Sequence, residues 1–188
     1  VKSVTAMTGQ AWDTRKITNG PRHGETVPVE TPTTVHGVLE FESGAIVTLG
    51  ASWDVAAHGH DNMELYGTEG SLKVPDPNYF GGNLRQAGTD GIWHDVTPDD
   101  HPFYVSNRAH DGATEDNRAN YRCAGLADMA LAILEGRPHR CNAGVALHAI
   151  DVMTGLLRAG ASRSWVHMTT TCARPDALNA DDARALMV

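Results

Sequence analysis

The chain has no pair of glycines two positions apart. Its 19 glycines never form G-x-G, so the G-x-G-x-x-G fingerprint of a dinucleotide-binding turn is absent. That turn lets a backbone approach the pyrophosphate at a helix N-terminus. We therefore expect no cofactor-binding residue and no bound dinucleotide in this chain.

Basic residues are also scarce. The chain has only three lysines, 15 Lys and Arg against 23 Asp and Glu, and a formal net charge of −8. Lys and Arg form no run, so the positive surface expected of a nucleic-acid or anionic-membrane binder is missing. We expect neither kind of partner.

Long apolar runs and paired cysteines are missing as well. No apolar run approaches the roughly 18 residues that a membrane helix needs, and no charged segment precedes an apolar one as in a signal peptide. The three cysteines form no C-x-x-C, which argues against a disulfide framework or a thiolate zinc site. We expect a soluble, cytoplasmic protein.

The length of 188 residues suits one good-sized core, and we predict a single domain over residues 1–188. The chain opens directly on a strand-like run, residues 1–7, without an initiator methionine. We interpret Val1 as the artificial or proteolytic start of a piece of a longer chain.

Alternating apolar residues predict antiparallel strands. Residues 35–42 and 45–53 alternate on either side of the turn Glu42-Ser-Gly44, which is typical of a β-hairpin. The alternation resumes at 63–66, and Gly67-Thr-Glu-Gly70 turns the chain into 71–74. We predict a meander of at least four antiparallel strands.

Two segments rich in Gly and Pro are predicted as loops. Residues 9–33 hold one short extended piece near 27–30, and residues 75–117 form a long excursion with one strand at 92–96. A discrete functional loop is the alternative for the second segment, because long loops often carry binding groups.

Two helices follow. The first spans roughly 118–135, and Gly136 and Pro138 end it. Asn142 caps the second, which runs to Gly160, and a last strand at 165–169 rejoins the sheet. Each helix has one apolar stripe that we expect to face the core. The stripe of the first helix consists of Leu126, Met129, Ala130, Ile133 and Leu134. The stripe of the second consists of Ala146, Ala149, Ile150, Met153, Leu156 and Leu157. The fold class is α+β, a mostly antiparallel open sheet with helices packed on one face.

Histidines raise the question of a metal site. His58 and His60 stand at i and i+2 beside Asp61, and on a strand both imidazoles would point the same way. No H-E-x-x-H or other ligand signature supports a metal, so none is predicted. Exposed polar histidines at a strand end, or hydrogen bonding to a substrate, remain as interpretations.

His148 and Asp151 lie opposite the apolar stripe of the second helix. No G-x-S-x-G elbow accompanies them, so we assign neither a catalytic role. One interpretation is a solvated helix face. The other is contact with an absent domain or subunit, because the line Gly144, His148, Asp151 and Gly155 is narrow enough for close approach.

The remaining aromatic and basic residues are scattered. Trp12, Trp93 and Trp165 are interpreted as packing residues, while Trp53 stands apart at a strand end just before His58. Arg122, Arg137 and Arg140 bracket the first helix and could bind an anion, although arginine near a helix C-terminus is also expected from the helix dipole.

Two blocks carry a family resemblance. Gly67-Thr-Glu-Gly-Ser-Leu72, followed by Gly125-Leu-Ala-Asp-Met129 running to Gly136-Arg-Pro-His-Arg140, resembles the substrate domain of the Gfo/Idh/MocA oxidoreductases. The resemblance covers most of the chain from Thr34 to Thr171. It implies a C-terminal domain with the fold of the glyceraldehyde-3-phosphate dehydrogenase C-terminal domain. An N-terminal Rossmann domain that binds NAD or NADP would lie outside this chain.

The resemblance also implies an activity for the full-length protein, a dehydrogenase acting on a sugar, polyol or related alcohol or ketone. The family's catalytic lysine in an E-K-P motif has no match here, and its acid/base histidine would lie upstream of Val1. The fragment is thus expected to be inactive alone and to hold no catalytic residue. Trp53, His58 and His60 are the candidates to face substrate.

A non-catalytic module that self-associates through its sheet is the alternative. The second sheet face, read from the alternation, carries a mixture suited to a contact between copies: Val38, Ile46, Thr48, Ser52 and Tyr66 beside Glu40 and Glu64. A homo-oligomer through this open face is expected under either interpretation.

Overall fold

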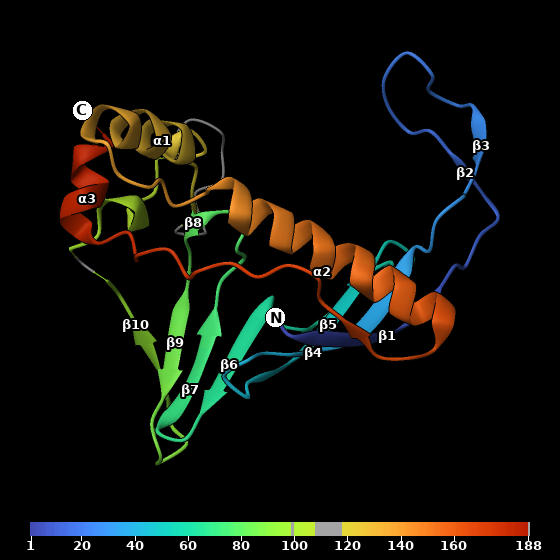
Figure 1. Ribbon diagram of the computed structural model, residues 1–188, viewed down its shortest axis with the longest axis horizontal. Helices are drawn as coiled ribbons and strands as arrows, with labels where there is room; N and C mark the ends of the chain where they lie inside the picture. Colours follow the sequence, from blue (N-terminus) through green and yellow to red (C-terminus); the bar gives the residue numbers. More distant parts are fainter. Residues whose placement is uncertain (99, 108–117, 188) are drawn as a thin grey trace. The chain divides into compact units, whose positions relative to one another are not determined.

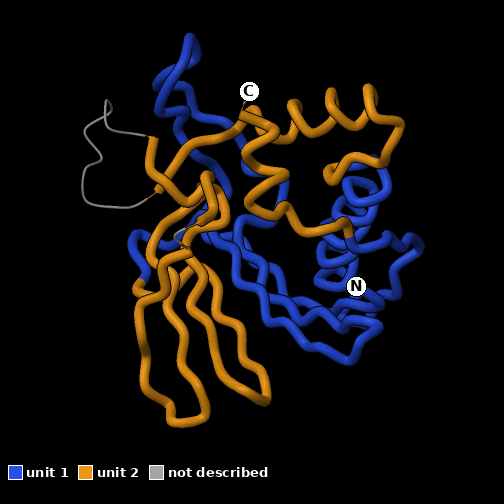
Figure 2. The backbone as a smooth tube through the Cα atoms, turned by 90° about the vertical axis from the view of Figure 1, so that its left-hand side faces the viewer, with its two compact units in different colours: residues 1–58, 142–174 blue, residues 59–141, 175–188 orange. Residues whose placement is uncertain are grey.

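The chain divides into two compact units. The computed structural model describes residues 1–98, 100–107 and 118–187. Unit 1 comprises residues 1–58 and 142–174, and unit 2 comprises residues 59–141 and 175–188 (Figure 2). The chain thus passes from unit 1 into unit 2, returns to unit 1 and ends in unit 2. A single domain stays a prediction.

Unit 1 is built on a four-stranded antiparallel sheet in the order β12-β1-β4-β5 (Figure 1). Its strands are β1 (Ser3–Gly9), β4 (Thr34–Glu40), β5 (Ile46–Ser52) and β12 (Val166–His167). The hairpin predicted over residues 35–53 is confirmed, with Leu39 opposite Val47 and Gly44 in the turn at φ +85°. The predicted last strand is also present, shortened to two residues.

Helix α2 (Ala143–Ser162) covers one face of this sheet (Figure 1). It begins as predicted, since the Asn142 side chain accepts a hydrogen bond from the nitrogen of Val145 at 3.1 Å. The unit 1 core between helix and sheet consists of Val4, Ala6, Leu39, Leu156 and Ala159. At Gly160 the helix lies so close to β1 that an added Cβ would overlap the Thr8 side chain.

The buried face of α2 is not the predicted apolar stripe. His148, Asp151 and Gly155 are buried, whereas Ile150 and Met153 are each 53% exposed. Leu156 is the one member of the predicted stripe that is buried. The stripe prediction is therefore wrong for this helix. So is the interpretation of His148 and Asp151 as a solvated face.

Hydrogen bonds to Asp151 explain why α2 buries the face that carries His148 and Asp151. Its Oδ2 accepts from the backbone nitrogens of Thr169 and Thr170 at 2.8 and 3.0 Å and from both threonine hydroxyls at 3.0 Å. Arg158 Nη2 lies 3.2 Å from Oδ1. The bond from the Thr169 nitrogen is the main cause that lowers the pKa of Asp151 from 3.8 to about 2. The carboxylate thus ties the segment after β12 to the helix.

Unit 2 holds a second antiparallel sheet, in the order β10-β9-β7-β6. Its strands are β6 (Met63–Gly67), β7 (Gly70–Val74), β9 (Leu84–Ala87) and β10 (Trp93–Val96). The predicted turn from Gly67 to Gly70 and the predicted strand near 92–96 are confirmed.

Two sequence predictions about the sheets are wrong. In the described residues β5 and β6 are outer strands of separate sheets, so the chain does not form one continuous meander. The excursion over 75–117 also contains β9, which sequence reasoning missed, because Leu84–Ala87 is short and has Arg85 and Gln86 at its centre. Residues 108–117 of that excursion lie outside the described residues.

The shorter elements complete both units. Unit 1 has the strand pair β2 (Thr14–Lys16) and β3 (Thr26–Pro28). Unit 2 has the pair β8 (Phe80–Gly81) and β11 (Arg118–Ala119), the 3₁₀ turn η1 (Pro102–Tyr104) and the helices α1 (Ala124–Glu135) and α3 (Ala180–Ala185).

Helix α1 begins later than predicted and also turns its apolar stripe outward. Residues 118–119 form β11, so the helix begins at Ala124, and Gly136 at φ +67° ends it as predicted. Asp128 and Ala132 are buried, whereas Ile133 and Leu134 are 72% and 84% exposed. The stripe prediction is wrong here too.

A buried carboxylate again accounts for the face. Asp128 accepts hydrogen bonds from the nitrogen and Nη1 of Arg140 at 2.8 and 2.7 Å, and Arg137 lies 3.1 Å away. Burial opposes ionisation, but these bonds lower the pKa of Asp128 below its usual value. Arg140 also pairs with Asp182 of α3 at 2.5 Å. These ion pairs inside unit 2 occupy two of the arginines considered for an anion site.

The predicted α+β class, mostly antiparallel sheet with helices, is confirmed. Among the described residues, no helix is both long and apolar enough to span a bilayer.

Replacing Asp151 by Asn should lower stability most at neutral pH. A carboxyl whose pKa is depressed in the folded state stabilises above its unfolded pKa of 3.8 and loses that contribution as pH falls through about 2. Urea unfolding of the wild type should therefore show falling stability between about pH 4 and pH 2. Asp151→Asn should show a shallower slope in that window. An exposed control, Asp13→Asn, should follow the wild type, and equal slopes for all three proteins would contradict the assignment.

Adding a methyl group to two helical glycines should have opposite effects. Gly160→Ala should destabilise by about 1–3 kcal/mol, because its Cβ overlaps Thr8. Gly125→Ala in α1 meets no atom within 4 Å and should stabilise by up to about 1 kcal/mol through helix propensity. Chemical denaturation of both variants measures the two signs, and a stabilising Gly160→Ala would refute the close packing of α2 on β1.

Candidate functional site

Trp53 directly follows β5 and combines a fixed backbone with a free side chain. Its nitrogen donates to the carbonyl oxygen of Thr33 at 2.9 Å, which extends the β4–β5 ladder by one step. Its carbonyl oxygen accepts from Arg15 Nη2 at 3.0 Å. The residue itself is 83% exposed. An indole is thus presented to its surroundings from a peptide held on both sides.

The next residue, Asp54, is the hub of this region. Its Oδ2 accepts from the hydroxyls of Thr33 and Thr34 at 2.6 and 2.9 Å, and its Oδ1 pairs with Arg15 at 2.6 Å. The bond from Thr33 is the main cause that lowers the pKa of Asp54. The carboxylate is therefore ionised at neutral pH and fixes both the strand end and Arg15.

Arg15 comes from a protruding segment, residues 10–33, which we call the arm. Its two strands β2 and β3 pair with each other, and most of its residues are exposed. Sequence analysis predicted a loop with one extended piece at 27–30. It missed β2 because Thr14-Arg-Lys16 has no apolar residue.

His58 and His60 are exposed and lie in the irregular segment between β5 and β6. They are outside any strand, so the argument that i and i+2 side chains point the same way does not apply to them. His58 belongs to unit 1 and His60 to unit 2. Asp61, their neighbour, pairs with Lys73 at 2.5 Å. Within the part of the chain that the structure describes, no three His, Cys, Asp or Glu residues gather as metal ligands do.

The structure places His148 and Asp151 together on the inner face of α2. His148 is 7% exposed, with Nδ1 3.0 Å from the Thr170 hydroxyl and Nε2 2.9 Å from the nitrogen of Val1. Both residues thus share Thr170. Contacts within unit 1 engage both side chains, and their role at an interface with another domain or subunit stays a prediction.

The face of the unit 1 sheet opposite α2 is open. The register places on it Ser3, Thr5, Met7, His36, Val38, Glu40, Ile46, Thr48, Trp165 and His167. Ile46 is 73% and Trp165 54% exposed, and together with Glu40 and His167 they line a hollow of about 530 Å³. Glu40 accepts from Ser3 Oγ at 2.6 Å, which is the main cause of its lowered pKa. Tyr66 and Glu64, predicted on the same face, lie on the unit 2 sheet instead.

The exposure of the tryptophans contradicts part of the prediction that Trp12, Trp93 and Trp165 are packing residues. Trp12 and Trp165 are 62% and 54% exposed, so neither is the packing residue that was predicted. Trp93 is partly buried, with Lys73 Nζ 5.3 Å from its ring centroid. Only Trp93 among these three fits the packing interpretation.

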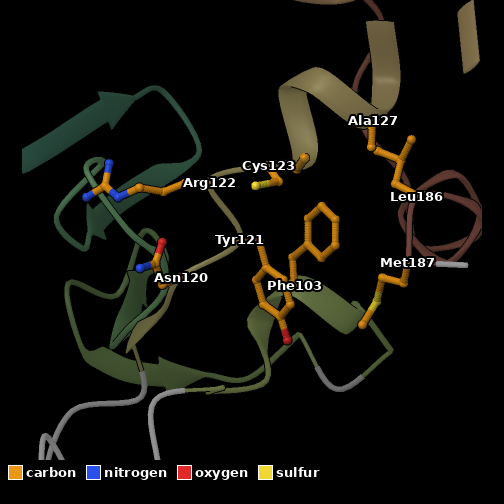
Figure 3. Close-up of a pocket in the computed structure, with 9 residues that line it drawn as sticks. Phe103, Asn120, Tyr121, Arg122, Cys123, Ala127, Leu186 and Met187 are labelled. Carbon is orange, nitrogen blue, oxygen red and sulfur yellow. The ribbon is translucent and has the colours of Figure 1, made fainter. Parts of the chain in front are cut away.

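Unit 2 contains a hollow that sequence reasoning missed. Its volume is about 480 Å³, and Figure 3 shows Phe103 and Tyr121 side by side in it, with Leu186 and Met187 on the other side. The two rings stack at 4.6 Å. Arg122 also lines the hollow, and its side chain donates to Asn78 Oδ1 at 3.3 Å. The lining residues come from three separate stretches without periodicity, so no sequence signal indicated this site.

The first part of the chain matches a known protein family. Residues 1–73 match the family model described as GFO/IDH/MocA C-terminal domain. A search of curated proteins finds no significant match.

Solved structures share the fold. Levoglucosan dehydrogenase in complex with NADH and L-sorbose has a TM-score of 0.66 at 20% identity, over 90% of this chain and 46% of its own. An NAD binding oxidoreductase from Klebsiella pneumoniae gives 0.67 at 20% identity, over 90% and 46%. Aldose-aldose oxidoreductase from Caulobacter crescentus complexed with glycerol gives 0.58 at 19% identity, over 89% and 41%.

The chain therefore spans less than half the length of each of these enzymes. These findings agree with the resemblance seen in the sequence: residues 1–73 match the model of the GFO/IDH/MocA C-terminal domain, and about nine-tenths of the chain shares the fold of these solved structures.

Proposed function

We propose that the chain is the substrate-binding and oligomerisation half of an NAD(P)-dependent oxidoreductase acting on a sugar, polyol or related alcohol or ketone. The observation that carries the proposal is the family match of residues 1–73 together with a fold shared with levoglucosan dehydrogenase and aldose-aldose oxidoreductase. The parent enzyme would be completed by an N-terminal Rossmann domain.

The residues of this chain do not fit a nucleotide. A dinucleotide pyrophosphate needs a glycine-rich turn leading into a helix, and the chain has no G-x-G. In the described residues α2 begins at Ala143, and the side chain of its N-cap Asn142 already accepts from the Val145 nitrogen. When bound to the Rossmann domain, NAD or NADP would supply hydride transfer. This chain would supply the wall that orients the substrate.

Trp53 and His58, both in unit 1, are the residues we propose for that wall, and His60 of unit 2 stays a substrate-facing candidate from the sequence alone. Trp53 is fixed by Thr33 and Arg15, and both histidines are exposed on the segment that follows it. Aromatic rings and imidazoles suit a sugar, since the ring packs on its C–H face and the imidazoles bond its hydroxyls.

The assay of the full-length protein tests this function. With its N-terminal domain present it should reduce NAD⁺ or NADP⁺ in the presence of at least one sugar or polyol from a broad panel, followed at 340 nm. The chain alone should neither turn over nor change NADH fluorescence. Binding of NADH by the isolated chain would contradict the proposal, and so would a full-length protein inactive on every alcohol and carbonyl tested.

The open sheet face supports a second role, self-association. Ile46, Met7 and Trp165 expose apolar surface on one face, beside Glu40 and Thr48, a mixture typical of contacts between subunits. A second copy of the chain would cover this face and create the predicted homo-oligomer.

Introducing a positive charge on this surface should dissociate the oligomer. Ile46→Lys places an ammonium in the proposed contact and should weaken self-association at least about tenfold in dissociation constant. Size-exclusion chromatography with light scattering over a range of concentrations measures it. Ile92, 57% exposed in unit 2, supplies the control Ile92→Lys, which should leave the mass unchanged. A monomeric wild type, or equal effects of both variants, would rule out this face.

A further inference from the structure

The peptide group of Trp53 is fixed more firmly than the end of a strand requires. Beyond the last residue of β5, its nitrogen still pairs with Thr33 and its carbonyl oxygen is bound by a guanidinium. The same Arg15 Nη2 reaches Asp54 at 2.6 Å. One nitrogen of Arg15 therefore holds two consecutive residues, Trp53 and Asp54, while Trp53 itself is left 83% exposed.

Further hydrogen bonds hold Asp54, the partner of Arg15. Its side chain is 12% exposed, and its second oxygen accepts from the hydroxyls of Thr33 and Thr34. Ser52 Oγ accepts from the Asp54 nitrogen at 3.1 Å. The Asp54 carboxylate is therefore held in place and in turn holds Arg15. Supporting bonds of this kind pre-organise the residues of functional sites.

An exposed indole on a fixed peptide has a defined use in a sugar-binding protein. Its flat apolar ring suits the C–H face of a sugar, and the polar groups around it suit the hydroxyls at the rim. We propose that Trp53 is the stacking platform for the substrate sugar ring and that Arg15, reaching from the arm, is its positioning residue. The proposal rests on the proposed function and deepens it by naming the residue that orients the platform.

The surroundings favour a sugar over a protein partner. The core of a protein contact is depleted in Lys, Glu and Asp. Here Arg15 binds the carbonyl oxygen of Trp53 and pairs with the carboxylate of Asp54, which also accepts from the hydroxyl of Thr33. Such polar donors and acceptors around one aromatic ring are the composition of a polyhydroxyl site.

A platform that binds substrate and transition state alike affects KM and leaves kcat unchanged. In the full-length enzyme, Trp53→Ala should raise the sugar KM about tenfold or more, and Trp53→Phe less, because a smaller ring remains. Arg15→Gln should raise KM several-fold with kcat within about twofold of wild type. Arg15→Lys, which keeps one cationic donor, should recover part of the loss.

The matched control is Arg22→Gln. Arg22 lies on the same arm and pairs at 2.8 Å with Glu25, three residues away, so its loss removes the same charge without touching Trp53. It should keep the wild-type KM. Circular dichroism and thermal unfolding of each variant identify a folding defect, which would lower kcat through the active fraction and leave KM unchanged.

The outcomes separate the two levels of the proposal. A wild-type enzyme without turnover on any sugar would overturn the proposed function, and this inference with it. An active enzyme whose Trp53→Ala variant keeps its KM would overturn the platform alone. A raised KM in Trp53→Ala with Arg15→Gln equal to Arg22→Gln would overturn the positioning role. Loss of oligomeric mass in Trp53→Ala, with KM unchanged, would assign the ring to a protein contact instead.

Discussion

Unit 1 depends on one buried carboxylate. Asp151 lies on the inner face of α2 and takes four hydrogen bonds from Thr169 and Thr170. These bonds hold the segment after β12 to the helix, and β12 is the outer neighbour of β1 in the sheet. Since β1 pairs with β4 and β4 with β5, the position of Trp53 and Asp54 at the end of β5 follows from that sheet.

The same principle decides how both long helices are oriented. A carboxylate deprived of water must be satisfied by donors, and an unpaired one would cost more than exposing a few apolar side chains. Asp128 in α1 finds Arg140 and Arg137, and Asp151 in α2 finds the two threonines. Each helix therefore packs through small and polar residues. In α2, Gly155 and Gly160 allow close approach. The apolar residues that remain exposed form surface suited to further packing.

The sequence predicted correctly the features that depend on a few adjacent residues. The hairpin over 35–53, the turn at Gly67–Gly70, the Asn142 cap and the Gly136 stop were all readable, because each depends on a few adjacent residues. The buried helix faces were not, since the donors to Asp151 lie 18 and 19 positions away. Sequence likewise marked Trp53 but not Arg15, whose partners are 38 and 39 positions away across an arm without hydrophobic periodicity.

The proposed function assigns two features of unit 1 to an oxidoreductase: the open sheet face and the exposed Trp53 at the end of β5. The most direct measurement is a crystal structure of the full-length protein with its nicotinamide cofactor and a sugar bound. The account predicts the sugar ring against the indole of Trp53, and the cofactor pyrophosphate held by residues outside this chain. A pyrophosphate cradled by residues of this chain, or a sugar remote from the end of β5, would contradict it.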